Sequence, residues 1–348
     1  MSSYKQSHQN FVKRRKTIFS LASMGMLAGA GLYSYTLKNE RKLSKKTSVP
    51  LQTVRIAWPH SHQDALFNVA CANNFFVKNS LNVQLSPQIQ TSQDALNAFK
   101  ANKCDAIVMS ALDWIPELIS GLKGKLLVGT GGSNFRLLVS KHRRIDRLAD
   151  LNKLKIAVGP GGQKEKLFLS ILLRRKGINP DQNISWIETE EKELLPTLLS
   201  NRVQAIITSD PLAWQILTAA KKQLYELAGS QTGSWSVRIN YVLGVSDHFL
   251  NNYPDTISPL AKSIRMASMW QKNNLKKTSD LLTESLKPMS SQDILLMLQH
   301  QNQNIAPINN KLWEQIAQYL DEFKLLNLLP MSLNSAKTAR QFCYTIKT

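Results

Sequence analysis

Two adjacent glycines, Gly161 and Gly162, join an apolar run at 155–158 to a helical pattern that begins at Gln163. At the start of a helix, free backbone N–H groups and the helix dipole favour an anion, and glycine lets a ligand approach the backbone. Lys164 would add a positive charge there, although the Gly-Lys-Ser/Thr spacing of a phosphate loop is missing. The turn therefore predicts an anion site, or else a plain strand-to-helix turn that needs glycine for its shape.

Polar or aromatic residues also follow the other apolar runs that we predict to be strands. In open α/β sheets, ligands bind beyond the carboxyl ends of the strands. We therefore expect a ligand site that combines Gly161, Gly162 and Gln163 with these residues. The further candidates are Trp58, His60, Ser61, Gln90, Thr91, Ser92, Ser110, Ala111, Ser209, Asp210 and Trp235.

Some of these candidates have a second interpretation. Trp58 is either an aromatic wall for the ligand or ordinary packing at a strand end. Asp210 would repel an anion, and it could instead pair with a donor or cap a helix that begins at Pro211. Trp235 lies near a predicted crossover between two lobes, where it could line the cleft.

Motifs for catalysis and metal binding are lacking in this sequence. It has no Gly-x-Ser-x-Gly elbow, no His-Glu-x-x-His helix and no dinucleotide-binding Gly-x-Gly-x-x-Gly. His60 and His62 are two residues apart on a predicted loop and have no evident further metal ligands. We therefore predict no catalytic residue, no metal and no cofactor.

The elements that must position the candidate residues alternate between short apolar runs and helical patterns from Val54 onward. This alternation predicts an α/β fold with mostly parallel sheets, and its repetition predicts two lobes. The two lobes would hinge about crossovers near 130–137 and 232–242. After Gly244 the pattern is helical, which predicts a helical C-terminal third. The predicted segments are lobe 1 at 53–132 and 240–330, lobe 2 at 133–239, and a tail at 331–348.

The N-terminal segment has the layout of an export signal. Residues 1–50 carry ten Lys or Arg residues against the single acid Glu40, and a basic run precedes an apolar stretch rich in small residues. We predict a signal or an uncleaved anchor at 1–36, attached to the membrane through 18–35 in the second case, and a basic linker at 37–52. Both the general and the twin-arginine export routes stay open. Either case predicts a protein in the periplasm or on the outer face of the cytoplasmic membrane.

Composition limits the other classes of function. The chain has 348 residues, of which 43% are hydrophobic, and a formal net charge of +20. A basic surface attracts anions, including nucleic acids. The basic residues beyond Pro50 are scattered, however, and no zinc-finger or helix-turn-helix pattern is present, so we expect no nucleic-acid partner. Cys71, Cys104 and Cys343 match no metal or redox spacing, and the first two are predicted to be buried apolar residues or a disulfide pair.

Several segments, taken in order, are similar to those of one family of binding proteins. They are Ala95–Phe99 with Cys104-Asp105-Ala106, Leu148–Leu151 with Lys155–Val158, Leu172–Ile178, Ile206–Pro211, and Phe249-Leu250 with Tyr253-Pro254-Asp255. Over residues 53–330, roughly, the chain resembles the nitrate/sulfonate/taurine-type solute-binding proteins of ABC importers. Asn74 and Asn201 stand where that family has glycine, and asparagine tolerates the left-handed backbone. Gln204, just before Ala205, stands where that family has an acidic residue.

The resemblance implies a type II periplasmic binding fold whose two lobes close on a small ligand. It implies a monomer that delivers this ligand to a membrane permease with an ATPase partner. Within the resemblance we expect an anion of the alkylsulfonate, taurine or nitrate class, while bicarbonate and a neutral pyrimidine stay open. Two other classes of function remain alternatives. One is an enzyme on the same fold, of the thiamin-pyrimidine or menaquinone pathway type, and the other is a membrane-anchored ligand sensor.

Overall fold

The computed structural model describes residues 51–59, 65–86 and 88–347. The chain divides into two compact units, Met1–Leu51 and Gln52–Thr348. The helices and strands described below all belong to the second unit.

Some predictions made from the sequence fall outside the described residues. They concern the signal or anchor at 1–36, nearly all of the linker at 37–52, and the candidate site residues His60 and Ser61. Within the ranges that are described, no helix combines the length and the apolar character that crossing a bilayer requires.

The first sheet has the strand order β2-β1-β3-β10-β4. β1 (Gln52–Ala57) pairs in parallel with β2 (Leu81–Leu85) and with β3 (Ala106–Ser110). β10 (Ile239–Ser246) is antiparallel to both of its neighbours, β3 and β4 (Gly124–Gly132). All residues of β3 and β10 are buried, as expected for strands covered on both faces.

The helices beside the first sheet begin where the sequence supplies caps. They are α2 (Ala65–Ala72), α3 (Phe75–Lys78), α4 (Ser92–Lys100) and α5 (Ala111–Ile119). Thr91 and Asp94 form a capping box at the start of α4, which satisfies two backbone N–H groups. Asn74 precedes α3 with φ 57°, and this confirms that asparagine takes the left-handed turn there.

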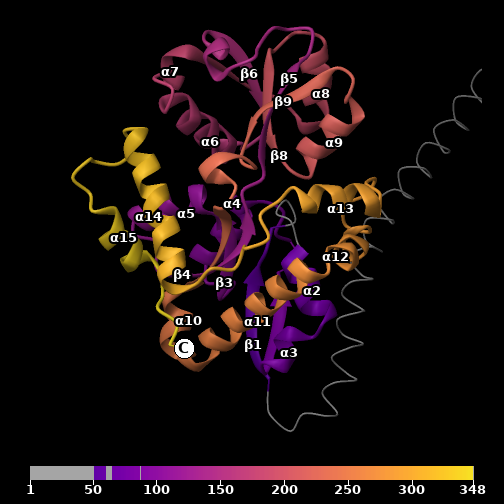
Figure 1. The fold of residues 1–348 in the computed structure, drawn as a ribbon. Coiled ribbons are helices and arrows are strands. Elements are labelled where there is room, and N and C mark those ends of the chain that lie inside the picture. The colour runs from indigo at the N-terminus through magenta and orange to yellow at the C-terminus, as the bar shows by residue number, and fades with distance from the viewer. Residues whose placement is uncertain (1–50, 60–64, 87, 348) are drawn as a thin grey trace, which may run out of the picture. The chain divides into compact units, whose positions relative to one another are not determined.

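The second sheet has the strand order β7-β6-β8-β5-β9 and lies above the first in Figure 1. β6 (Leu154–Val158) pairs in parallel with β7 (Ile184–Glu188) and β8 (Ala205–Ser209). β5 (Phe135–Ser140) is antiparallel to β8 and to β9 (Leu224–Gly229). The remaining elements here are η1 (Leu148–Leu151), α6 (Gln163–Arg174), α7 (Pro180–Asn183), α8 (Glu191–Leu199), α9 (Leu212–Ala219) and η2 (Gly233–Trp235).

The prediction of mostly parallel sheets is wrong, because each sheet has two parallel and two antiparallel pairings. The prediction supposed that a helix joins each strand to a neighbour in the same sheet. Instead the chain leaves the first sheet after β4 and enters the second directly as β5. It returns after β9 and inserts β10 between β3 and β4. Both strands that enter a sheet from the other one run against their neighbours.

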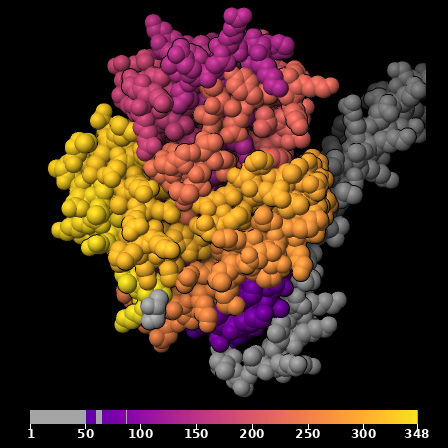
Figure 2. Space-filling view, in the orientation of Figure 1, coloured from indigo at the N-terminus to yellow at the C-terminus, as the bar shows by residue number. Residues whose placement is uncertain are grey.

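The C-terminal part is helical, as expected. It comprises α10 (Asp247–Asn252), α11 (Pro254–Asn273), α12 (Leu275–Leu282), α13 (Ser291–Gln299), α14 (Asn309–Leu325) and α15 (Ser335–Phe342). Figure 2 shows these segments, in orange and yellow, covering much of one face. The region expected to be a tail at 331–348 includes α15 and a bridge from Cys343 to Leu126 of β4.

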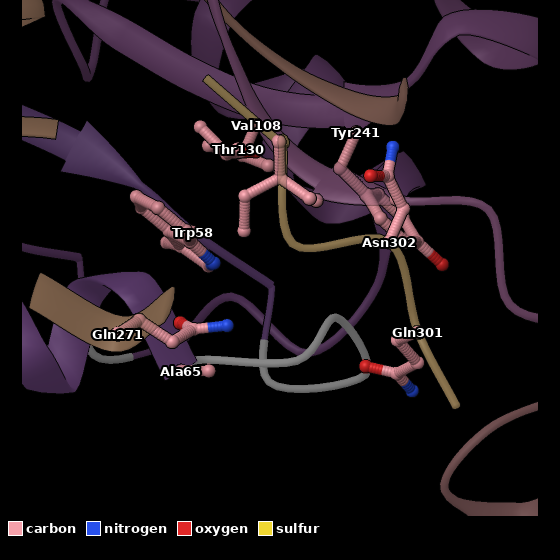
Figure 3. A pocket seen from close by; sticks show the side chains of 11 residues that line it. Trp58, Ala65, Val108, Thr130, Tyr241, Gln271, Gln301 and Asn302 are labelled. Atoms are coloured by element: carbon pink, nitrogen blue, oxygen red, sulfur yellow. The ribbon is translucent and has the colours of Figure 1, made fainter. Parts of the chain in front are cut away.

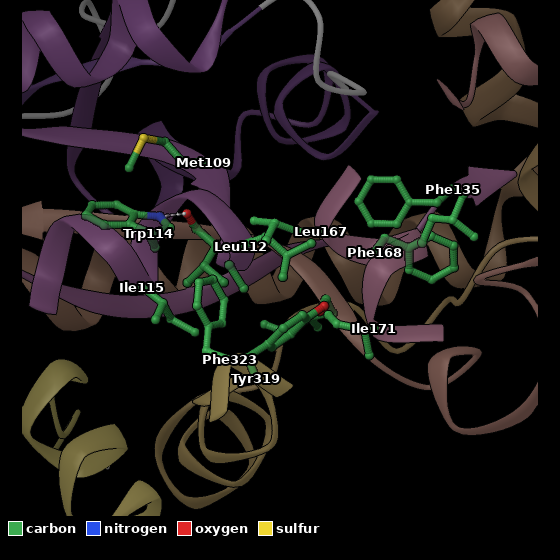
Figure 4. Packing of buried hydrophobic residues seen from close by; sticks show 14 of the residues in the cluster. Met109, Leu112, Trp114, Ile115, Phe135, Leu167, Phe168, Ile171, Tyr319 and Phe323 are labelled. Carbon is green, nitrogen blue, oxygen red and sulfur yellow. Dashed lines mark hydrogen bonds between the residues drawn. The ribbon is translucent and has the colours of Figure 1, made fainter. Parts of the chain in front are cut away.

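A buried aromatic core joins α14 to both sheets (Figure 4). Phe135 of β5 stacks on Phe168 of α6 with ring centroids 4.7 Å apart, and Phe168 meets Trp235 edge-on at 4.9 Å. Trp235 in turn contacts Tyr319 of α14, whose hydroxyl donates a 2.7 Å hydrogen bond to the Ile239 carbonyl. α14 therefore packs against the segment by which the chain returns to the first sheet.

The three cysteines are unpaired. Cys104 and Cys343 are buried, and burial raises the pKa of the Cys71 and Cys104 thiols to about 12. The disulfide alternative for Cys71 and Cys104 is therefore not realised in this structure.

Candidate functional site

A small pocket lies at the carboxyl ends of the first sheet's parallel strands. Trp58 follows β1, and Thr130 comes near the end of β4. Gln271, from the last turn of α11, borders it on the same side as Trp58, and Asn302, from the segment after α13, lies opposite (Figure 3). The volume is about 20 Å³, only slightly more than one water molecule needs, so a solute of several atoms would bind there only if the lining moves apart. This edge is where open α/β sheets bind ligands.

Four side chains of this lining carry a buried polar atom that has no hydrogen-bond partner. The atoms are Trp58 Nε1, Thr130 Oγ1, Gln271 Oε1 and Asn302 Nδ2. Trp58, Thr130 and Gln271 are only 3–4% exposed. A buried polar atom without a partner costs free energy, so such atoms gathered around one pocket indicate that bound water or a ligand bonds them.

The orientations of the two amides follow from their other hydrogen bonds. Gln303 donates through Nε2 to the carbonyls of Leu298 and Gln301, so its Oε1 is the atom that accepts from Gln271 Nε2 at 3.4 Å. Gln271 Oε1 is left as the acceptor at the pocket. Asn302 Oδ1 accepts from the backbone N–H of residue 304 at 2.9 Å, which leaves Nδ2 as a donor. The pocket thus has two fixed donors, on Trp58 and Asn302, and one fixed acceptor.

A second group of polar side chains lies where α6 meets the first sheet. Lys164 Nζ lies over the ring of Tyr241, 5.6 Å from its centroid, and 4.0 Å from Glu165 Oε1. Glu165 also accepts a 3.0 Å hydrogen bond from Ser209 of β8. Asp113 of α5 is a third charged member, and burial raises its pKa although Lys164 opposes the shift. Contacts of this group therefore bridge the two sheets.

A buried ion pair holds the neighbouring end of the second sheet. Arg136 of β5 donates to both carboxylate oxygens of Asp210, at 2.7 Å and 2.9 Å, and to Glu226 at 2.5 Å. The Arg136 guanidinium also lies over the Trp214 ring, 5.2 Å from its centroid. Gln301, which lines the pocket, donates to Asp210 at 3.3 Å. Asp210 thus pairs with donors and links the segment after α13 to the second sheet.

The glycine turn before α6 is shaped by local packing. Gly161 has φ +65°, and a Cβ on Gly162 would overlap Val158 and lie 2.9 Å from the Gly159 carbonyl. Glu165, in the first turn of α6, is buried, and its Oε2 has no partner. A carboxylate of the chain itself therefore occupies the position where the helix dipole would favour an anion. These contacts favour the plain-turn interpretation of Gly162.

Five of the other predicted site residues lie at three places. Trp58 lines the pocket, and Ser92 and Ser209 donate to Asp113 and Glu165 in the group at α6. Ser110 caps α5 beside the buried Ala111.

The remaining predicted residues lie elsewhere. Thr91 caps α4, and Gln90 and Gln163 are exposed. Trp235 is in the aromatic core described above, where it contacts Phe168 and Tyr319.

Sequence reasoning missed Thr130, Tyr241, Gln271 and Asn302. Thr130 and Tyr241 lie in the ranges predicted as crossovers between the lobes, but in the structure they belong to β4 and β10, so neither was recognised as a ligand candidate. Gln271 is one polar residue in the last turn of a long helix, and no local pattern separates it from its neighbours. The run of four glutamines and asparagines at 301–304 was the one available signal, because so many amides in a row need partners.

Metal binding finds no support in the described part of the chain, where no group of three or more His, Cys, Asp or Glu side chains could hold an ion.

Comparison with known families matches residues 48–283 to the model of the NMT1-like family. The chain belongs to the NMT1-like family. No curated protein sequence matches this member of the family.

Solved structures extend this likeness to the whole fold. The aliphatic sulphonate-binding protein SsuA of Escherichia coli matches with a TM-score of 0.67 and 15% identity, over 84% of this chain and 97% of its own. SsuA of Xanthomonas axonopodis pv. citri, bound to MOPS, matches with a TM-score of 0.65 and 14% identity, over 84% and 99%. The nitrate-binding protein NrtA of Synechocystis PCC 6803 matches with a TM-score of 0.64 and 12% identity, over 84% and 86%.

These matches confirm two expectations from the sequence. This NMT1-like chain has the periplasmic binding protein fold with a helical C-terminal part, and its structural neighbours are the sulfonate- and nitrate-binding proteins that the resemblance named.

Proposed function

We propose that this protein is an extracytoplasmic solute-binding protein that delivers a small solute to an ABC importer. The observation that carries the proposal is the pocket at the strand ends of the first sheet, where four buried polar atoms lack partners. The fold and family support it, since the solved structures to which the chain is similar include the sulfonate- and nitrate-binding proteins described above. No catalytic role is proposed.

Binding would act through the contacts that bridge the two sheets. Lys164 reaches from α6 to Tyr241 of β10, and Gln301 reaches from the pocket to Asp210. A solute that bonds the pocket stabilises the state in which both of these contacts are made, one by α6 and the other by the segment after α13. A ligand shifts such an equilibrium only by its differential affinity for the two states. The permease with its ATPase would then recognise this state, and the N-terminal export segment would put the protein outside the cytoplasmic membrane.

The test is binding by the full chain, followed by transport. Native mass spectrometry would identify solutes that co-purify, and thermal unfolding would be followed with taurine, methanesulfonate, nitrate, bicarbonate and hydroxymethylpyrimidine. A solute at about 100 times its dissociation constant adds about 2.7 kcal/mol of stability. We expect a shift that is lost in Trp58→Ala, and loss of uptake of that solute in cells that lack the chain.

Two results would contradict the proposal. One is that no solute co-purifies or shifts unfolding, and the other is that the shift is the same in Trp58→Ala. Normal uptake without the chain would contradict the importer part alone.

A further inference from the structure

The charge of the solute can be argued from the pocket lining. Among the described residues that line the pocket, none carries a charged side chain. The lining instead has the donors Trp58 Nε1 and Asn302 Nδ2, the acceptor Gln271 Oε1, and the Thr130 hydroxyl, which can do either.

The described cations next to the pocket already have carboxylate partners. Lys164 lies beside Glu165, and Arg136 is held by Asp210 and Glu226. These partners neutralise the local positive charge, so neither of these two described cations is free to pair with an anion in the pocket.

Either kind of ion would therefore be bound unfavourably. An oxyanion without a proton, such as acetate, nitrate or methanesulfonate, has acceptors only, so it would meet the Gln271 carbonyl oxygen without a bond. No described residue of the lining would supply it with an opposite charge. A cation has donors only and would meet the N–H groups of Trp58 and Asn302. A solute with both kinds of group satisfies the whole set.

We propose that the pocket binds a small uncharged solute that carries both acceptors and a donor, of the amide or urea kind, instead of the anion expected from the sequence. This rests on the proposed solute-binding function. The two fixed donors bond the acceptors of the solute, Gln271 accepts from its N–H, and Thr130 takes the remaining position.

The test uses pairs of solutes that match in shape and differ in charge. They are acetamide with acetate, urea with nitrate, and methanesulfonamide with methanesulfonate, each titrated calorimetrically into the full chain. Burial of an unpaired charge is costly, so we expect the uncharged member of at least one pair to bind about tenfold tighter or more than its anion.

Two substitutions with matched controls locate the binding. Asn302→Asp keeps the acceptor for the backbone of residue 304 but replaces the pocket donor, and the exposed Asn304→Asp adds the same charge outside the lining. Trp58→Phe removes one N–H, and Trp313→Phe makes the same change at another indole without a partner. We expect Trp58→Phe to weaken binding of the uncharged solute by about 2- to 10-fold and Asn302→Asp by at least as much, with both controls unchanged.

The outcomes separate this inference from the proposed function. If an anion binds as tightly as its uncharged match and depends on Trp58, the protein binds solutes but the inferred class is wrong. If no member of any pair binds, the inferred class is also wrong, while co-purification decides the function independently. Equal losses in Asn302→Asp and Asn304→Asp would show that the lining does not select the solute.

Discussion

Removal of the Asp210 carboxylate would leave the Arg136 guanidinium, which is 4% exposed, with Glu226 as its one remaining carboxylate. Breaking a buried ion pair by losing one partner costs about 3–5 kcal/mol, because the other charge stays buried. Two charge-assisted hydrogen bonds at 2.7 Å and 2.9 Å are lost, and bonds of this kind contribute about 1.5–3 kcal/mol each. Since Glu226 still compensates part of the charge, we expect Asp210→Ala to lower the free energy of unfolding by about 3 kcal/mol.

Urea unfolding of the full chain, followed by circular dichroism, measures this loss. The control is Glu284→Ala, which breaks an ion pair with Lys287 whose side chains are more than 60% exposed, and which should cost less than about 1 kcal/mol. The double variant Arg136→Met with Asp210→Ala should be less unstable than the sum of the two single variants, because only the partly exposed Glu226 is then left without its partner. A cost below about 1 kcal/mol for Asp210→Ala, or additive effects in the double variant, would refute the reasoning.

Three other outcomes follow from local geometry. In Gly129→Ala the new Cβ would lie 2.5 Å from a carbonyl oxygen of the segment that covers the pocket. We expect this substitution to lower the free energy of unfolding in urea by about 1–3 kcal/mol and to weaken solute binding. Gly159→Ala, whose new Cβ has its nearest neighbour at 3.6 Å, should change neither. Burial raises the pKa of Asp113 above the usual 3.8, so its contribution to stability falls as the pH rises above about 4, and Asp113→Asn should gain on the wild type there. Hydrogen bonds lower the pKa of Asp94, so its contribution falls as the pH drops below about 4, and Asp94→Asn should gain on the wild type only in that acidic range. Stability curves of the variants that run parallel to the wild-type curve would contradict both signs. Burial raises the pKa of Cys104 to about 12 from 9.0, so at pH 8 its thiolate fraction is about a thousandfold lower than normal, and a thiol reagent should label it only after unfolding.

Much of the fold could be predicted because its local signals agree. The helical pattern that begins at Gln163 is α6 in the structure, and Asn74 takes the left-handed turn expected of it. The apolar runs around Ile107 and Ile206 are strands, since unbroken β-branched and apolar residues suit strands covered on both faces. The prediction of strand direction was wrong, because a run of apolar residues does not determine which strands it pairs with or in which direction.

The candidate site was less predictable for a related reason. Trp58 was found because it directly follows a strand, where the position itself marks a binding edge. Gln271 and Asn302 come to the same pocket from helical and irregular segments far along the chain. Their roles depend on which amide atom is already bonded, and this is a property of tertiary contacts alone.

The place of β10 in the first sheet has a consequence for the order in which the protein folds. β10 separates β3 from β4, yet it follows every strand of the second sheet in the sequence. During synthesis, which starts at the N-terminus, all strands of the second sheet can pair once residue 229 has been made. β3 and β4 must wait until residues 239–246 arrive, and until then each has an open edge that invites pairing with other chains. The half of the molecule that is made first is therefore completed last, and it is this half that contains the pocket.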